Sequence, residues 1–288
     1  MRAAVAVAIA AAAVPILACL SAPAHALEPL PDSALAKVAG RDGMSFNLSN
    51  FAMAGNAELR YYAPGGGSLG IGNLAASRSD NPDAPFADPY RLDIVPGGAG
   101  RADIINIAFP ENAAGREIWQ VAYDFGVNAN DLDVKGGSVI LKDLVYYGGG
   151  MQWSTPAVGD GLAFGLATRI ELGSLTLAPN GRDATGEALV LSNVKIGAAT
   201  ADGSAPTAPW RIADVTSQAG IFNARTDETG KSSLHIGIGW ADAGQAAPSG
   251  TLQIGNISFR SDAGANMDLG SSRIGAIQLQ YLDVKFRQ

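Results

Sequence analysis

Val139-Ile140-Leu141-Lys142-Asp143-Leu144 decides the fold, because the same pattern recurs along the chain. Two apolar residues lie two positions apart, and Asn or Asp then precedes a third apolar residue. Alternation with a period of two is typical of a half-buried β-strand. Asn or Asp within it favours a bend or bulge, where the side chain bonds to the local backbone. The other copies are Phe46–Phe51, Leu69–Leu74, Leu189–Val194 and Leu252–Ile257.

Outward from these copies, the chain after Met44 consists of short apolar segments separated by glycine, proline, Asn and Asp, with almost no helical periodicity. The sequence therefore predicts an all-β fold. The predicted strands are Ser45–Met53, Ser68–Ala75, Arg91–Val95, Asp103–Phe109, Ile118–Gly126, Ser138–Tyr147, Leu162–Ala178, Ala188–Gly197, Trp210–Val215, Ser233–Trp240, Thr251–Arg260 and Ser272–Phe286.

Two architectures satisfy this pattern. The recurrent Asn or Asp favours a β-solenoid or roll, in which similar strands stack and each such residue sits at a corner of its coil. The irregular spacing of the copies keeps a large β-sandwich as the alternative, where alternation marks one buried face. We therefore expect solenoid-like stacked sheets with one short N-terminal helix, and a sandwich as the second choice.

Residues 1–26 are predicted to be a cleavable secretory signal peptide. A basic start at Arg2 precedes an apolar run that ends at Leu20, and an Ala-x-Ala cleavage site ends at Ala26. Lipid on Cys19, within a loose lipobox, is the less favoured alternative and would tether the chain to a membrane. The expected location is the periplasm, the outer-membrane surface or the extracellular space.

The rest of the chain divides into two predicted parts. Residues 27–43 form a short helix and a glycine turn, in which Asp32 can cap the start and Gly40 can end the helix. Residues 44–288 form a single all-β domain. Cys19 is the only cysteine, so the mature chain makes no internal disulfide. Its 262 residues (288 minus 26) are enough to bury a sizeable core.

Composition excludes several classes of partner. Charged residues make up 16% of the chain and hydrophobic residues 47%, which excludes a disordered tail. Without Arg2 the mature chain carries 19 basic and 27 acidic residues, a net charge of −8, and the basic residues are scattered. This distribution argues against nucleic acid and anionic lipid as partners.

The sequence offers little catalytic chemistry. His235 is the one histidine of the predicted mature domain, because His25 leaves with the leader. It alternates with Leu234 and Ile236, so we expect it on the opposite, wetter face of a strand. One histidine without cysteine makes no ordinary zinc site, and no Gly-x-Ser-x-Gly elbow is present. We predict no enzyme activity and no cofactor.

Calcium and sugars remain as weaker expectations. Asp80, Asp83 and Asp88 share one loop, and a second cluster runs from Asn128 to Asp133; such oxygen ligands suit calcium, but neither loop has a known calcium motif. The tryptophans are expected in core packing, and a sugar-stacking platform is the alternative. They are Trp119, Trp153, Trp210 and Trp240.

The segment from Leu30 to Gly43 resembles one that follows the signal peptide in a family of exported Gram-negative, β-rich proteins of unknown function, some of them labelled pilus assembly proteins of the FilA type. The resemblance covers 14 residues and implies an envelope or surface protein associated with filaments. Where many members carry Gln, this chain has Arg41. The other matching residues are Asp32, Leu35, Val38, Gly40, Asp42 and Gly43.

These observations favour a non-enzymatic structural or assembly protein of the envelope or cell surface, pilus-associated or adhesive. Its expected partners are other envelope or pilus proteins, or further copies of itself. The six residues just listed are the predicted docking element. The alternative is a periplasmic or secreted module that binds a glycan or a lipid.

Overall fold

The computed structural model describes residues 43–46, 48, 51–56, 58–62, 67–78, 88–98, 101–113, 117–129, 132–226, 230, 232–239 and 247–287. They belong to one compact unit, Arg41–Gln288. The predicted signal peptide, Cys19 and the predicted N-terminal helix lie outside the described residues.

The described residues form strands and turns and contain no helix. The strands in chain order are β1 Met44–Phe46, β2 Ala52–Ala54, β3 Leu59–Tyr62, β4 Ser68–Arg78, β5 Tyr90–Val95, β6 Ile104–Ala108, β7 Trp119–Ala129, β8 Leu132–Ser154, β9 Leu162–Ala178, β10 Ala188–Ala198, β11 Trp210–Ala213, β12 Gly220–Thr226, β13 Ser232–Gly239, β14 Gly250–Arg260, β15 Met267–Ile277 and β16 Tyr281–Arg287.

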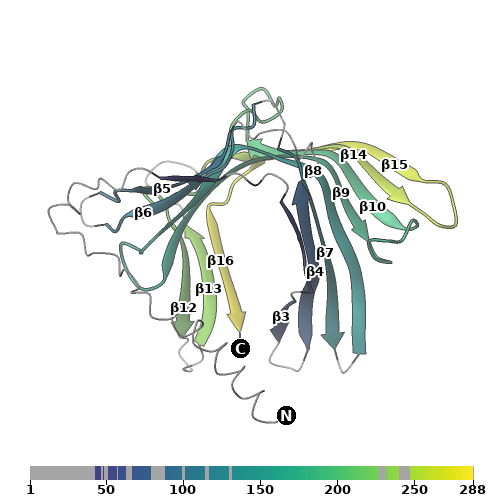
Figure 1. Cartoon of the computed structure of the whole chain (residues 1–288), viewed down its shortest axis with the longest axis horizontal. Helices are drawn as coiled ribbons and strands as arrows, with labels where there is room; N and C mark the ends of the chain where they lie inside the picture. Colours follow the sequence, from purple (N-terminus) through teal and green to yellow (C-terminus); the bar gives the residue numbers. More distant parts are fainter. Residues whose placement is uncertain are drawn as a thin grey trace, which may run out of the picture. The chain divides into compact units, whose positions relative to one another are not determined.

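A long antiparallel hairpin, β8 with β9, organises the sheet (Figure 1). Where Ser138 faces Ala178, the order across the sheet is β3-β4-β7-β8-β9-β10-β14-β15. Where Ser154 faces Ala163, β8 pairs with β6 and β9 with β12, and the order becomes β1-β5-β6-β8-β9-β12-β13-β16. Two sets of strands therefore share one hairpin, and the sheet does not close on itself.

β8 changes its partner at Gly148-Gly149-Gly150, where all three φ angles are positive, at 69°, 87° and 153°. A Cβ on the second glycine would lie 2.3 Å from the carbonyl oxygen of Ala167. Left-handed backbone and this close approach both require glycine. The sequence analysis ended the strand at Tyr147, whereas β8 continues through the glycines to Ser154.

The recurrent Asn or Asp marks a backbone bend at three of the five copies; Asn50 lies outside the described residues, and Asn256 has no positive φ but lies where the β14–β15 register shifts. Asn73, Asp143 and Asn193 have φ angles of 51°, 53° and 51°, in the left-handed region that Asn and Asp tolerate best. Asp143 and Asn193 each lie beside a glycine on the next strand. A Cβ on Gly173 would lie 2.7 Å from Asp143 Oδ2, and one on Gly255 would lie 2.9 Å from Asn193 Cβ. Asp143, Gly173, Asn193 and Gly255 are in register on four neighbouring strands, and we call this line of residues the corner.

The main core lies against this corner. Residues on either side of the bend point to one face although they are three positions apart, such as Leu141 with Leu144 and Leu191 with Val194. The buried members of the core are Tyr90, Trp119, Leu144, Leu172 and Val194, and Phe46 and Phe51 pack against them. A second core under β9, β11 and β13 contains Phe164, Ala213 and Ile238.

The all-β prediction is confirmed. β9 has the predicted bounds, and most other predicted strands are present with ends shifted by a few residues. β3 and β12 were not predicted, the first predicted strand divides into β1 and β2, and the last divides into β15 and β16. No helix in the described part of the chain is long and apolar enough to span a membrane.

Candidate functional site

The strands at one edge of the sheet form an arm, which we define as residues 58–62, 67–73, 124–129 and 132–138. The pairing of β3, β4, β7 and β8 shows which side chains of the arm share a face. Arg60, Gly70, Gly126 and Lys135 are in register on one face. The next row, Tyr61-Leu69-Val127-Val134, is on the other face. Because opposite residues of antiparallel strands share a face, the arm is polar on one side and apolar on the other.

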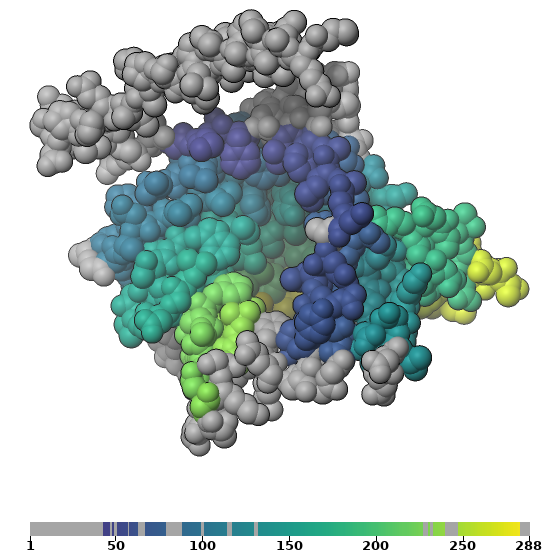
Figure 2. Space-filling model, turned by 60° about the horizontal axis from the view of Figure 1, so that its bottom comes forward, coloured from purple at the N-terminus to yellow at the C-terminus, as the bar shows by residue number. Residues whose placement is uncertain are grey.

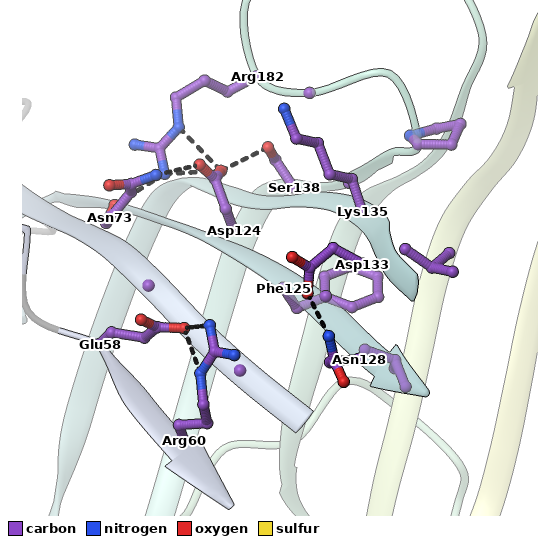
Figure 3. A pocket seen from close by; sticks show the side chains of 18 of the residues that line it. Glu58, Arg60, Asn73, Asp124, Phe125, Asn128, Asp133, Lys135, Ser138 and Arg182 are labelled. Atoms are coloured by element: carbon purple, nitrogen blue, oxygen red, sulfur yellow. Dashed lines mark hydrogen bonds and ion pairs between the residues drawn. The ribbon is translucent and has the colours of Figure 1, made fainter. Parts of the chain in front are cut away.

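A groove with a volume of about 1090 Å³ lies on the polar face (Figure 3). The arm and the β9–β10 loop, residues 179–187, both contribute to it. The base of the groove is largely backbone, because Gly70, Gly72 and Gly126 replace side chains there. Polar side chains along its walls therefore determine what the groove can bind.

Asp124 on β7 is the most heavily hydrogen-bonded of these side chains. Its Oδ1 accepts hydrogen bonds from Ser138 Oγ at 2.6 Å and from Arg182 Nη2 at 2.8 Å. Its Oδ2 accepts one from Asn73 Nδ2 at 2.8 Å. Arg182 also donates to the backbone oxygen of Asn73 at 2.7 Å. The cluster thus ties the β9–β10 loop to β4, β7 and β8.

These bonds determine the charge of the carboxylate. Partial burial raises the pKa of Asp124, but the hydrogen bonds from Ser138, Asn73 and Arg182 together outweigh it and hold the pKa below its ordinary value. A carboxylate with a lowered pKa and three donors is a poor proton acceptor. Its chemistry is positioning and electrostatic binding rather than proton transfer.

Two further pairs line the groove. Arg60 donates to Glu58 Oε1 from Nε at 3.0 Å and from Nη2 at 2.5 Å. Asn128 Nδ2 donates to Asp133 Oδ1 at 2.8 Å. Lys135 projects into the groove from β8 (Figure 3). Guanidinium, amide, carboxylate and ammonium groups thus share one surface, which suits a ligand rich in hydroxyls or mixed charges.

The opposite face of the arm is apolar and open to solvent. Leu59, Leu132 and Val134 are 73%, 68% and 59% exposed. Figure 2 shows the blue residues of β3 and β4 on the open surface, bordering a hollow. Soluble monomers seldom expose so many neighbouring apolar side chains unless they bind something. The seven residues of this apolar face are Leu59, Tyr61, Leu69, Ile71, Val127, Leu132 and Val134.

Of the predicted docking element, only Gly43 lies among the described residues. A Cβ there would lie 1.8 Å from Asp93 Oδ1 on β5, so close packing explains this glycine without a docking role. Asp32, Leu35, Val38, Gly40 and Asp42 lie outside the described residues.

The predicted position of His235 is wrong. It is 4% exposed, and its Nδ1 lies 2.6 Å from Asn223 Oδ1. Its neighbour Leu234, which was expected on the buried face, is 50% exposed. Strand alternation separated the two residues correctly, but β13 is covered on both faces: Ile238, on the same face as Leu234, is also buried.

Core packing accounts for the described tryptophans. Trp119 is buried, and its Nε1 donates to Glu117 Oε1 at 3.1 Å. Trp210 is buried and donates to the carbonyl oxygen of Pro248 at 2.8 Å. Trp153 is half-buried against Phe164. None of the three forms an open platform, and Trp240 lies outside the described residues.

The expected calcium ligands are only partly described. Asp88 Oδ2 accepts the backbone N–H of Asn112 at 2.9 Å, and Asp133 accepts from Asn128. Asp80 and Asp83, like residues 130 and 131, lie outside the described residues. In the described ranges, no three or more His, Cys, Asp or Glu side chains are grouped so that they could hold a metal ion.

The groove was not predicted from the sequence, although Asn128 and Asp133 of the second expected calcium cluster line it. Asn73 and Asp124 are 51 positions apart, and Arg182 is 58 further on, so no local motif joins them. The recurrent strand pattern contained one clue to the groove, because Asn73 belongs to it. The backbone bend at Asn73 directs its side-chain amide toward Asp124. Among known proteins, no family model, no curated sequence and no solved structure matches the chain.

Proposed function

We propose that this chain is a non-enzymatic, exported structural or assembly protein of the envelope or cell surface, pilus-associated or adhesive. The exposed apolar face of the arm carries the proposal. A face of seven apolar residues gains free energy when a partner removes it from water, at about 25 cal/mol per Å².

The partner we expect is another envelope or pilus protein that supplies an extended strand. β3 lies at the outer edge of the arm and pairs with β4 alone of the described strands. An added strand would pair along the outer edge of β3 and cover Leu59 and Tyr61. The predicted export signal and the resemblance of residues 30–43 to pilus-associated proteins support the same role.

For the finer architecture we propose that the strands of this chain stack as in a β-solenoid or roll, because the bends at Asp143 and Asn193 both lie beside Gly173 of β9. A large β-sandwich is the alternative.

The test replaces two residues that face each other on the apolar side, Leu69 and Val127. Leu69→Lys with Val127→Glu keeps a favourable cross-strand pair but removes apolar surface. The matched control places the same residues at another directly opposed pair of β4 and β7, as Ser77→Lys with Gln120→Glu, and neither position lines the groove.

We expect the apolar-face variant to fold but to leave the envelope fraction, and the control to remain with it. Cell fractionation and immunogold labelling measure both. Equal retention of the two variants would show that the apolar face does not anchor the protein.

The polar groove favours a second function, a periplasmic or secreted glycan-binding module. Its mixed donors and acceptors suit sugar hydroxyls better than acyl chains. Glycan-array binding by the wild type that is lost in Arg182→Ala would support this function. Undiminished binding by the variant would place the ligand elsewhere.

A further inference from the structure

The outermost strand on the other side of the sheet, β15, has an open edge (Figure 1). It pairs with β14 and with no other described strand. Residues 267–276 are all exposed. Natural proteins cover or interrupt an edge of this length, because its free N–H and C=O groups bind other strands.

The sequence of β15 is complementary to itself when it is reversed. Met267-Asp268-Leu269-Gly270-Ser271-Ser272-Arg273-Ile274 begins with an apolar and an acidic residue and ends with a basic and an apolar residue. Two antiparallel copies centred between Gly270 and Ser271 would place apolar beside apolar and acid beside base.

The faces of the strand agree with such pairing. Ile274 is opposite Leu252, which packs on the main core. Met267 is opposite Phe259, two positions from Ile257, which is opposite Leu191 of the same core, so both residues lie on the core side of the sheet. In a regular strand, residues seven apart would lie on opposite faces. Gly270, with a φ of 80° at an irregular register, brings them to one face.

The two charged residues share the other face. Asp268 is opposite Ser258, and Arg273 is opposite Gln253. Asp268 Oδ1 accepts a hydrogen bond from Asn256 Nδ2 of β14 at 2.9 Å, which orders the carboxylate and leaves its Oδ2 to accept from a partner. Opposite charges directly across two strands stabilise the pairing, and like charges oppose it.

We propose that β15 pairs antiparallel with β15 of a second copy of this chain, around a two-fold axis between Gly270 and Ser271. Asp268 then faces the partner's Arg273, and Met267 faces the partner's Ile274. The interface is isologous, so each contact occurs twice. The inference rests on the proposed assembly function and names one partner in it.

Other registers of β15 pairing do not place opposite charges and apolar residues face to face. A shift by one residue places Arg273 opposite the partner's Leu269 and Asp268 opposite the partner's Ile274. Parallel pairing places each Asp268 near its own counterpart. Of these registers, only the centred antiparallel one pairs both charges and both terminal apolar residues, Met267 and Ile274, while Leu269 faces the partner's Ser272.

Cysteine cross-linking measures the register directly. With Cys19→Ser in every variant, an introduced cysteine is the only one in the chain. A tagged Met267→Cys copy mixed with an untagged Ile274→Cys copy should form a disulfide-linked heterodimer. Each variant alone should not, because identical positions would be about 23 Å apart, beyond disulfide reach.

Charge reversal tests the same register by sedimentation equilibrium. Asp268→Arg alone and Arg273→Asp alone should each weaken self-association at least about tenfold, because like charges then face each other twice. A 1:1 mixture of the two variants restores both opposite-charge pairs and should form a heterodimer. Circular dichroism checks that each variant remains folded.

A monomeric wild type, or a dimer that neither charge reversal weakens, would overturn the inference. A monomer that is still retained in the envelope would leave the proposed function intact. A β15-linked dimer that is absent from the envelope would support the pairing and count against the proposed function.

Discussion

β7 and β8 each run from a buried half to an exposed half, and the two halves differ only in what covers them. Near the corner, Trp119 and Leu144 are buried because Phe46, Phe51 and Tyr90 pack over them. In the arm, Val127 and Val134 belong to the same register, but no described element covers them. Alternation thus defines a face, and a separate part of the chain decides whether that face becomes core.

The largest expected effect comes from shortening one side chain in the buried half of β8 and one in its exposed half. Leu144→Ala should lower the free energy of unfolding by about 2–5 kcal/mol, because it leaves a cavity in the core. Val134→Ala should change it by about 0.5 kcal/mol or less, because the side chain is mostly exposed. Urea unfolding measures both, and equal losses would mean that the arm is covered in solution.

The corner itself provides the next test. Gly173→Ala would place a Cβ 2.7 Å from Asp143 Oδ2 and should destabilise the fold by about 1–3 kcal/mol through overpacking. Adding Asp143→Gly removes the clash and retains the left-handed backbone, so it should recover much of the loss. Gly264→Ala is the control, because the position is open. A Gly173→Ala variant as stable as the control would refute the account of the corner.

The smallest expected effect lies on the polar face of the arm and depends on pH. The folded pKa of Asp124 is below its ordinary value, so its contribution is present above about pH 4 and is lost as the pH falls through the folded pKa. Asp124→Asn should cost about 1 kcal/mol or less at pH 7, since the group is partly exposed.

Stability measured from pH 7 to pH 2 checks the sign of this effect. The difference between the wild type and Asp124→Asn should shrink as the pH falls. Asn180→Ala, at the exposed rim of the same groove, is the control and should show no such trend, because it removes no titratable group. A difference that grows toward low pH would contradict the hydrogen-bond account.

The sequence by itself determined the all-β class, most of the strands and the bend at Asn73, Asp143 and Asn193. Each of these depends on local physics. A period of two defines a strand, and Asn and Asp tolerate left-handed backbone better than other residues with side chains. The length of β8 was not evident, because Gly148-Gly149-Gly150 usually ends a strand and here carries it across a bend.

Only the tertiary structure decided which faces are buried and which residues meet. His235 and Leu234 alternate as the sequence predicts, but β13 is covered on both faces, so His235 is buried as well as Ile238. Asp124 meets Arg182 because three strands and a loop bring distant segments together. Burial and long-range contact depend on the order of strands in the sheet, which local alternation does not encode.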